Sequence, residues 1–153
     1  MIINGSDLLD AAPLTPMERG KMVHISPNGF KTSYGLTECG YDIRLAQDVW
    51  LHPFRRKVLV HSLERFHMPN HLMGKVMNKS TLARLWLDAS RCTNIEPGWR
   101  GHLTIELEYS AWWPRKLYRG MGIAQIMFEE IKNPASYSGK YQDQPDQPVG
   151  AIY

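Results

Sequence analysis

"HLTIELEY", residues 102–109, is the stretch that decides the fold class of this chain. Apolar and polar residues alternate along it: Leu103, Ile105, Leu107 and Tyr109 are separated by His102, Thr104, Glu106 and Glu108. A period of two is typical of a β-strand that buries one face and exposes the other. The sequence therefore predicts a strand whose outer face carries two carboxylates, either as a solvated surface or as part of a site.

Further stretches of this kind lie on both sides of the first one, with turn residues between them. They are residues 41–46, 48–52, 57–66, 72–77, 115–118 and 122–131. Short strands at such spacing predict a mainly β fold, a sandwich or a barrel-like jelly roll, and not a helical bundle.

Two short helices are expected to interrupt the strands. Ser6 is the predicted N-cap of a helix that extends to Ala12 and stops at Pro13. The second helix is predicted to begin at Ser80 and to run through Leu87, with its leucine and alanine side chains packed on the sheet.

The C-terminal residues 133–153 differ from the rest of the chain. They are rich in Pro, Gly, Ser, Gln and Tyr and have no sustained apolar period. We expect this segment to be mobile or to form an arm that docks elsewhere, and residues 1–132 to form one β domain.

Composition excludes several classes of protein. The chain has 153 residues, of which 43% are hydrophobic and 22% are charged, and no apolar run of about 18 residues could span a bilayer. The first residues lack the pattern of a secretory signal, and the only cysteines are Cys39 and Cys92. We therefore expect a cytoplasmic protein without a disulfide framework or a membrane partner.

The basic residues give no clear sign of a nucleic-acid surface. The net charge is +3, and the one cluster is Arg55, Arg56 and Lys57, which is typical of a solvated edge. Nucleic acid is not an expected partner.

Motifs of metal chemistry are missing from the sequence. A zinc deaminase needs an H-x-E and a P-C-x-x-C signature, and neither occurs. His67 and His71 are four residues apart, but Pro69 between them disfavours a helix that would bring them onto one face. We therefore expect no zinc and no metal ligand among the side chains.

The turn "NKSTLAR", residues 78–84, has the composition of an anion site. If Ser80 began a helix, the free amides of the first turn would suit a phosphate, with Lys79 and Arg84 adding positive charge. A purely structural helix cap is the alternative. Downstream, Glu96 and Trp99 in "NIEPGWRG" (94–101) are candidates for a sugar hydroxyl contact and a pocket wall, or for a simple turn.

Together these stretches resemble the dCTP deaminase family, relatives of the trimeric dUTPases. The resemblance rests on five motifs in the same order as in the family: "YDIRL", "HSLERFHMPNHLMGKVMNKSTLAR", "NIEPGWRGHLTIEL", "KLYRGMGIAQIMF" and "YSGKYQDQ". It implies a distorted, jelly-roll-like β-barrel of the dUTPase type with one or two short helices, assembled as a homotrimer with active sites between subunits.

The resemblance also implies a reaction and its residues. Glu106 would be the general base that activates a water for attack on C4 of cytosine. Ser80 and Arg84 would position the water and the base, and the backbone near Cys92 would contact the exocyclic amine. No zinc takes part in this chemistry.

Other residues would bind the rest of the nucleotide. The expected substrate-binding set is Lys79, Thr81, Cys92, Asn94, Glu96, Trp99, Tyr137, Lys140 and Gln144. Within it, Glu96 would bind the 3′-hydroxyl, and Lys79 and the three tail residues would meet the phosphates together with Mg²⁺. Residues 133–153 would then be a lid over the active site. The chain departs from the family motifs with Lys79 in place of Arg, Glu96 in place of Asp, and Asn94.

The expected function is the hydrolytic, metal-independent deamination of a deoxycytidine nucleotide, dCTP or else dCMP, to the deoxyuridine nucleotide and ammonia, feeding dUMP and dTTP synthesis. One alternative is a dUTP diphosphatase or an enzyme that performs both reactions. The other is a nucleotide-binding trimer without catalysis.

Overall fold

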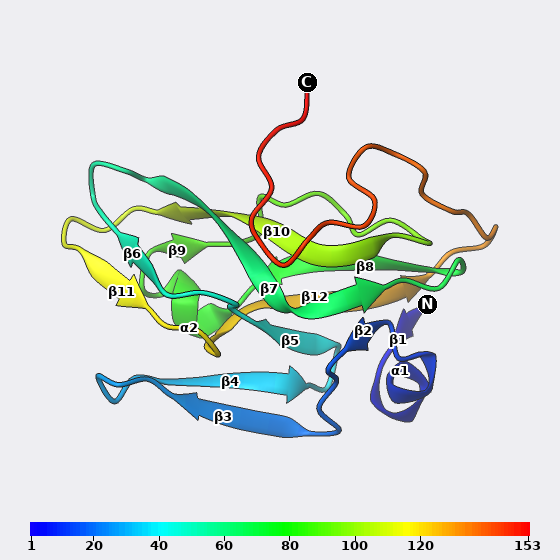
Figure 1. Cartoon of the computed structure of the whole chain (residues 1–153). Coiled ribbons are helices and arrows are strands. Elements are labelled where there is room, and N and C mark those ends of the chain that lie inside the picture. Colours follow the sequence, from blue (N-terminus) through cyan, green and yellow to red (C-terminus); the bar gives the residue numbers. More distant parts are fainter.

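The computed structural model describes residues 1–153 and consists mainly of β-strands (Figure 1). The strands are β1 (Ile2–Ile3), β2 (Leu14–Thr15), β3 (Lys21–Ile25), β4 (Lys31–Leu36), β5 (Tyr41–Arg44), β6 (Val49–Leu51), β7 (Lys57–His67), β8 (Leu72–Asn78), β9 (Leu87–Asp88), β10 (Arg100–Tyr109), β11 (Arg115–Leu117) and β12 (Gly122–Glu130). The helices are α1 (Gly5–Ala11) and α2 (Ser80–Ala83). The mainly β fold class predicted from the sequence is confirmed.

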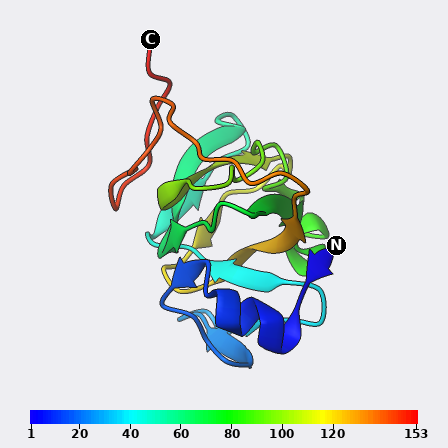
Figure 2. The same ribbon diagram turned by 90° about the vertical axis from the view of Figure 1, so that its right-hand side faces the viewer.

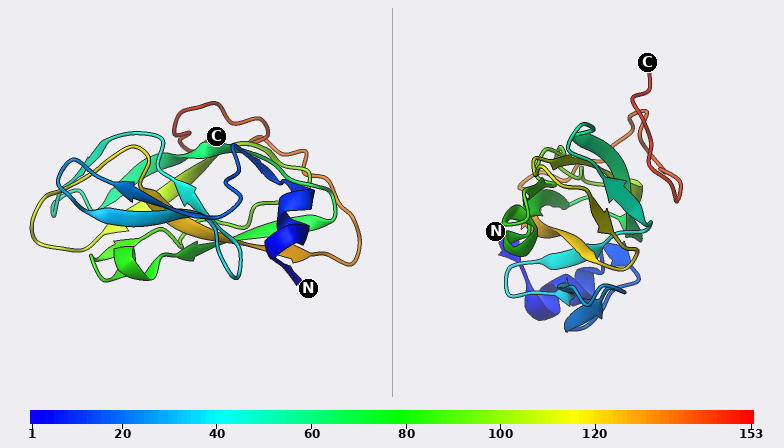
Figure 3. Two further views of the ribbon diagram at one scale, coloured as in Figure 1. Left: turned by 90° about the horizontal axis from the view of Figure 1, so that it is seen from below. Right: turned by 90° about the vertical axis from the view of Figure 1, so that its left-hand side faces the viewer.

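The strands form two large sheets that curl around one core (Figure 3). In the larger sheet, β12 pairs with β8 on one edge and with β1 and β5 on the other, and β5 continues into β4 and β3. The second sheet has the order β2-β7-β10-β9, and β6 and β11 form a separate ribbon. Apolar side chains of both large sheets, among them Tyr41, Phe66, Ile105 and Phe128, are fully buried between them.

The pairing of β7 with β10 positions the polar face of residues 102–109. Arg100 pairs with His67 and Glu108 with Lys57, but the register shifts between His102 and Thr104. At the shift, residues 62–64 of β7 lie opposite a single residue of β10, which is a β-bulge. The extra residues of the bulge belong to β7.

The bulge explains where the predicted alternation fails. Ile105, Leu107 and Tyr109 are fully buried, as the alternation predicts. Leu103, on the other side of the register shift, is only half-buried and lies at a pocket instead of in the core. Thr104, predicted on the exposed face, is 8% exposed because the C-terminal residues cover it.

Both predicted helices exist, and α2 begins at Ser80 as predicted, but both predicted N-caps were wrong. The N-cap of α1 is Asn4 and not Ser6. The N-cap of α2 is Lys79, so Ser80 is the first helical residue, and the helix has only four residues. Trp86 has a φ of 64°, in the left-handed region, which prevents the helix from continuing to Leu87.

The segment after β12 leaves the larger sheet and crosses to the outside of β10, and the C-terminus lies far from α1 and the β3–β4 hairpin (Figures 1 and 2). We call residues 133–153 the arm. Neither helix has the length and apolar character that a membrane crossing requires.

Candidate active-site pocket

A pocket of about 610 Å³ lies between β10, the loop before it and the arm. Leu103, Thr104 and Glu106 of β10 line one side. Residues 92–96 and Trp99 line the second side, and Tyr137, Tyr141, Gln144 and residues 149–151 of the arm line the third.

Many of the residues predicted from the sequence meet in this pocket. Those that line it are Cys92, Asn94, Glu96, Trp99, Glu106, Tyr137 and Gln144. They come from three separate stretches of chain, which supports the interpretation of those stretches as one site. No lysine, arginine or histidine lines the pocket, so its only charged groups are the carboxylates of Glu96 and Glu106.

Glu106 is held on a rigid element. Its backbone pairs with Leu59 of β7, and the neighbouring Ile105 and Leu107 are fully buried in the core. Its own side chain is exposed and faces the pocket. A carboxylate on such a strand can meet a ligand in a defined position, because the buried neighbours fix the direction of the backbone.

Cys92 lies beside Glu106 and is a neutral group. Its Sγ is 3.9 Å from the carbonyl oxygen of Thr104. Burial raises the pKa of Cys92 to about 12, and the negative charge of Glu106 acts in the same direction. The thiol therefore stays protonated near neutral pH and is a poor nucleophile and a poor metal ligand.

The state of this thiol can be tested by alkylation. At about pH 8, we expect iodoacetamide to modify Cys92 at least about 100-fold more slowly than the exposed Cys39, because only the thiolate reacts. Mass spectrometry of digested protein over time gives both rates in one sample. Equal rates for the two cysteines would contradict the assigned environment of Cys92.

The loop before β10 is anchored so that its polar residues face the pocket. The backbone of Ile95 exchanges hydrogen bonds with Gly74 of β8, at 2.8 and 2.9 Å. A side chain at position 74 would crowd Ile95, since a Cβ there would lie 3.1 Å from its side chain. Because Ile95 is buried by this contact, Asn94 and Glu96 on either side of it are exposed at the pocket.

Trp99 connects this loop to the core and to the arm. Its ring packs on Phe66 at a centroid distance of 6.0 Å. Its Nε1 donates a hydrogen bond of 2.7 Å to the carbonyl oxygen of Tyr141 in the arm. Trp99 thus lines the pocket and is also an attachment point for the arm.

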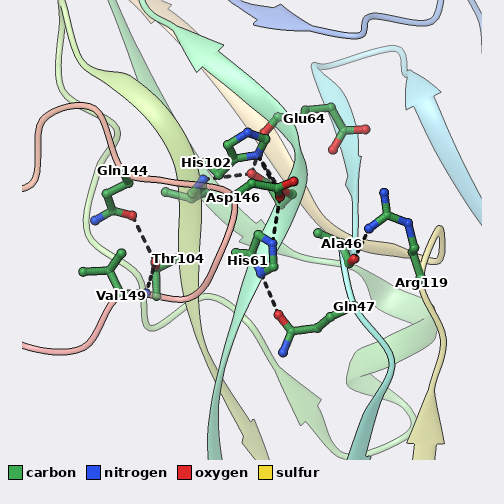
Figure 4. A network of polar contacts seen from close by, with 12 residues as sticks. Ala46, Gln47, His61, Glu64, His102, Thr104, Arg119, Gln144, Asp146 and Val149 are labelled. Carbon is green, nitrogen blue, oxygen red and sulfur yellow. Dashed lines mark hydrogen bonds and ion pairs between the residues drawn. The ribbon is translucent and has the colours of Figure 1, made fainter.

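Charged side chains also hold the arm on the sheet. Asp143 makes two hydrogen bonds with the guanidinium of Arg100, at 3.0 and 3.1 Å. Further along, Asp146 Oδ1 lies 3.0 Å from Nε2 of His61 and 3.7 Å from Nδ1 of His102 (Figure 4). The arm is therefore docked over β10 by ion pairs and hydrogen bonds.

The polar cluster around His61 was not predicted from the sequence. His61 Nδ1 contacts Gln47 Oε1 at 2.6 Å, and burial lowers the pKa of His61 although Asp146 opposes the shift. The only signal in the sequence was a histidine within the apolar run "KVLVHSLERF". Its partner Asp146 is 85 residues away, which no local pattern reveals.

The residues of the Lys-Ser-Thr turn are not brought to the pocket within one chain. Lys79 is buried, and its Nζ donates to Ser33 Oγ at 3.2 Å and to the carboxylate of Asp42. Ser80, Thr81 and Arg84 are exposed on or just after α2, and Arg84 makes no ion pair. In the arm, Lys140 lies outside the pocket with its ammonium 5.5 Å from the ring centroid of Tyr141.

The donor groups of the molecule do not assemble a metal site. No three histidine, cysteine, aspartate or glutamate side chains are placed to hold an ion. Any divalent ion at this pocket would need ligands from the bound molecule.

The chain is similar in sequence to a known protein family and to individual members of it. The model of the family described as dCTP deaminase-like matches residues 41–131. A dCTP deaminase of Herpetosiphon aurantiacus is 34% identical over 76% of this chain and 80% of its own length.

Solved structures with the same fold include members of two related groups of enzymes. A dUTPase from phage phi11 of S. aureus aligns with a TM-score of 0.58 and 18% identity, covering 79% of this chain and 96% of its own. A 2′-deoxycytidine 5′-triphosphate deaminase from Agrobacterium tumefaciens aligns with a TM-score of 0.59 and 15% identity, covering 83% of this chain and 47% of its own. The predicted dUTPase-type fold is confirmed. The match to the family model and the relative of 34% identity together show that the chain belongs to the dCTP deaminase-like family.

Proposed function

We propose that this protein deaminates a deoxycytidine nucleotide by hydrolysis, giving the deoxyuridine nucleotide and ammonia. The observation that carries the proposal is the exposed carboxylate of Glu106, held on β10 and facing a pocket that also contains Asn94, Glu96 and Trp99. The similarity to relatives named dCTP deaminase supports the same reaction.

Glu106 has the chemistry that the reaction requires. As a carboxylate it takes one proton from a water molecule while the water oxygen bonds to C4 of the cytosine ring. It then returns a proton to the amino nitrogen, the bond from C4 to that nitrogen breaks, and ammonia leaves. The neutral thiol of Cys92 beside it adds no competing charge. The backbone at this position would contact the amine.

The sugar and the base would be held by the walls of the pocket. Glu96 accepts a hydrogen bond from the 3′-hydroxyl of deoxyribose, and Trp99 and Asn94 border the base. Tyr137 and Gln144 of the arm close the opposite side, so that the arm, residues 133–153, serves as a lid on the β domain of residues 1–132.

The phosphates require positive charge that one chain does not bring to this pocket, because no basic residue lines it. Arg84, Ser80 and Thr81 are exposed, so a neighbouring molecule can contact them. This supports a homotrimer in which α2 of one subunit completes the pocket of the next. Lys140 in the arm adds further positive charge, whereas the ammonium of Lys79 is already paired with Asp42 within the chain.

A metal ion would enter only with the substrate. Mg²⁺ would be held by phosphate oxygens, and it would neutralise part of their charge. Zinc plays no part in the proposed reaction, because the water is activated by Glu106 and no three suitable ligands gather at the pocket.

The proposal is tested by offering purified protein dCTP, dCMP and dUTP in separate reactions with Mg²⁺. Ammonia and pyrophosphate are measured independently. We expect ammonia from a cytosine nucleotide, and activity that persists after treatment with a zinc chelator. Pyrophosphate from dUTP without ammonia would support the dUTP diphosphatase that the fold also allows. Formation of both products would indicate a bifunctional enzyme. If neither product forms, the remaining candidate is a nucleotide-binding trimer without catalysis.

A further inference from the structure

We infer that Thr104 is a positioning residue whose hydroxyl holds the end of the arm as the outer wall of the pocket. The inference deepens the proposed function and rests on it for its catalytic readout. Thr104 is 8% exposed, and its Oγ1 makes two hydrogen bonds to the arm (Figure 4). It donates to Gln144 Oε1 at 3.0 Å and accepts from the backbone N–H of Val149 at 3.0 Å.

The position of Thr104 on β10 connects the arm to the proposed catalytic group. Thr104 and Glu106 are two residues apart on one strand and both line the pocket. Thr104 is also the first β10 residue after the bulge, where it pairs with His61. On the other strand of the bulge, Ser62 Oγ accepts a hydrogen bond of 2.8 Å from the backbone N–H of Leu103. The hydroxyl of Thr104 is therefore held in place by the sheet.

The early part of the arm has several other anchors. The backbone N–H of Asp143 donates to the carbonyl oxygen of Arg100 at 2.8 Å, and that of His102 donates to the carbonyl oxygen of Gln144 at 3.1 Å. Asp146 contacts His61. Residues 143–146 would thus stay docked without the hydroxyl of Thr104.

The last part of the arm has a single direct hydrogen bond to the β domain, and Thr104 accepts it. The only hydrogen bond between residues 147–153 and the β domain is the one from Val149 to Thr104. The other bonds of this segment stay within the arm, at Tyr141, Lys140 and Pro145. Residues 149–151 line the pocket, so the hydroxyl of Thr104 holds this wall of the pocket in place.

The matched variants are Thr104→Val, which keeps the shape and removes the hydroxyl, and Thr104→Ser, which keeps the hydroxyl. Thr37→Val is the control, because it also removes a hydroxyl that hydrogen-bonds a side-chain amide, that of Gln125, on the other sheet. Circular dichroism and thermal melting verify that all variants are folded.

Hydrogen exchange tests the contact without any reference to catalysis. We expect peptides covering residues 147–153 to exchange about 10-fold faster in Thr104→Val than in the wild type, since a net hydrogen bond corresponds to roughly this factor. Thr104→Ser and Thr37→Val should exchange like the wild type. Gln144→Ala, which leaves the bond to Val149, should accelerate exchange in this segment less than Thr104→Val does.

Steady-state kinetics tests the consequence for the pocket. A wall that contacts the substrate equally before and during the reaction affects KM and leaves kcat nearly unchanged. We expect KM for the cytosine nucleotide to rise about 10-fold in Thr104→Val, with kcat within about threefold of the wild type, and Thr104→Ser to restore KM. Unchanged exchange in Thr104→Val overturns the inference. Faster exchange in a protein that releases no ammonia at all supports the contact and refutes only the proposed function.

Discussion

Replacing Glu106 by glutamine is expected to reduce ammonia release from the cytosine nucleotide by about 10³-fold or more, while the nucleotide still binds. The amide has nearly the shape of the carboxylate but cannot accept a proton from water. The strand should be unaffected, because the side chain is exposed and its buried neighbours Ile105 and Leu107 are unchanged. Ammonia release gives kcat, and titration calorimetry gives binding.

The strand supplies its own control for this prediction. Glu108 lies two residues further along β10, and its Oε2 pairs with Arg91 Nε at 2.6 Å outside the pocket. Glu108→Gln removes the same negative charge from the same strand, so it should keep kcat close to the wild-type value. Near-normal turnover in Glu106→Gln would remove this carboxylate from the mechanism, and an equal loss in both variants would indicate a general electrostatic effect.

The sequence was sufficient for the parts of the fold that depend on local periodicity. The alternation in residues 102–109 predicts β10 and the burial of Ile105, Leu107 and Tyr109. It fails at Leu103, because the β-bulge in β7 shifts the register, and at Thr104, because the arm covers that residue. The bulge and the arm are both contacts with residues far away in the sequence, and a periodic pattern contains no information about such contacts.

The N-terminal part of the chain contains strands that the periodicity of the sequence did not predict. No strand was predicted before residue 41, yet β3 and β4 form a hairpin there. β3 has no buried residue, so the burial that creates an alternating pattern is missing. The hairpin is maintained by its backbone pairing and by its attachment to β5.

Part of the pocket lining was predictable from the sequence, but the arrangement of the residues was not. Motif order identified Glu106, Glu96 and Cys92, and the fold brings them to one pocket. The same motifs do not reveal that Lys79 is buried against Asp42 in a single chain, or that the arm is docked through Asp146 and two histidines. These contacts join residues far apart in sequence, so they follow only from the tertiary structure.

The second large effect is expected on stability, at the buried ion pair of Glu64 and Arg44. Glu64 is fully buried, and its carboxylate accepts hydrogen bonds from Arg44 Nε at 2.7 Å and from the Arg44 backbone N–H at 2.8 Å. The Arg44 side chain is 13% exposed and lies over the ring of Tyr34 at 4.7 Å. Glu64→Ala should lower the free energy of unfolding by about 3–5 kcal/mol, because it leaves the buried guanidinium with only the more distant and more exposed Glu18 carboxylate, at 3.7 Å.

Urea unfolding at one fixed protein concentration measures this loss. The control is Lys116→Ala, which breaks the more exposed pair with Asp48, keeps the hydrogen bond from the Arg119 backbone N–H to Asp48, and should cost about 0–1 kcal/mol. A loss for Glu64→Ala no larger than for this control would show that the buried pair contributes little.

Removing the pair completely should cost less than removing half of it. In Arg44→Leu/Glu64→Leu no charge is left buried, so much of the stability lost in Glu64→Ala should return.

Arg44→Leu alone leaves the carboxyl of Glu64 without its partner. Burial already raises the pKa of Glu64 while the hydrogen bonds from Arg44 lower it, so without Arg44 the folded-state pKa should lie further above the unfolded value of about 4.5. The folded state then holds its proton more tightly than the unfolded state, and the stability of Arg44→Leu, relative to the wild type, should fall as pH rises above the folded-state pKa that Glu64 has in the wild type. A difference between the two proteins that does not change with pH would show that Glu64 is solvated or finds another cation when Arg44 is absent.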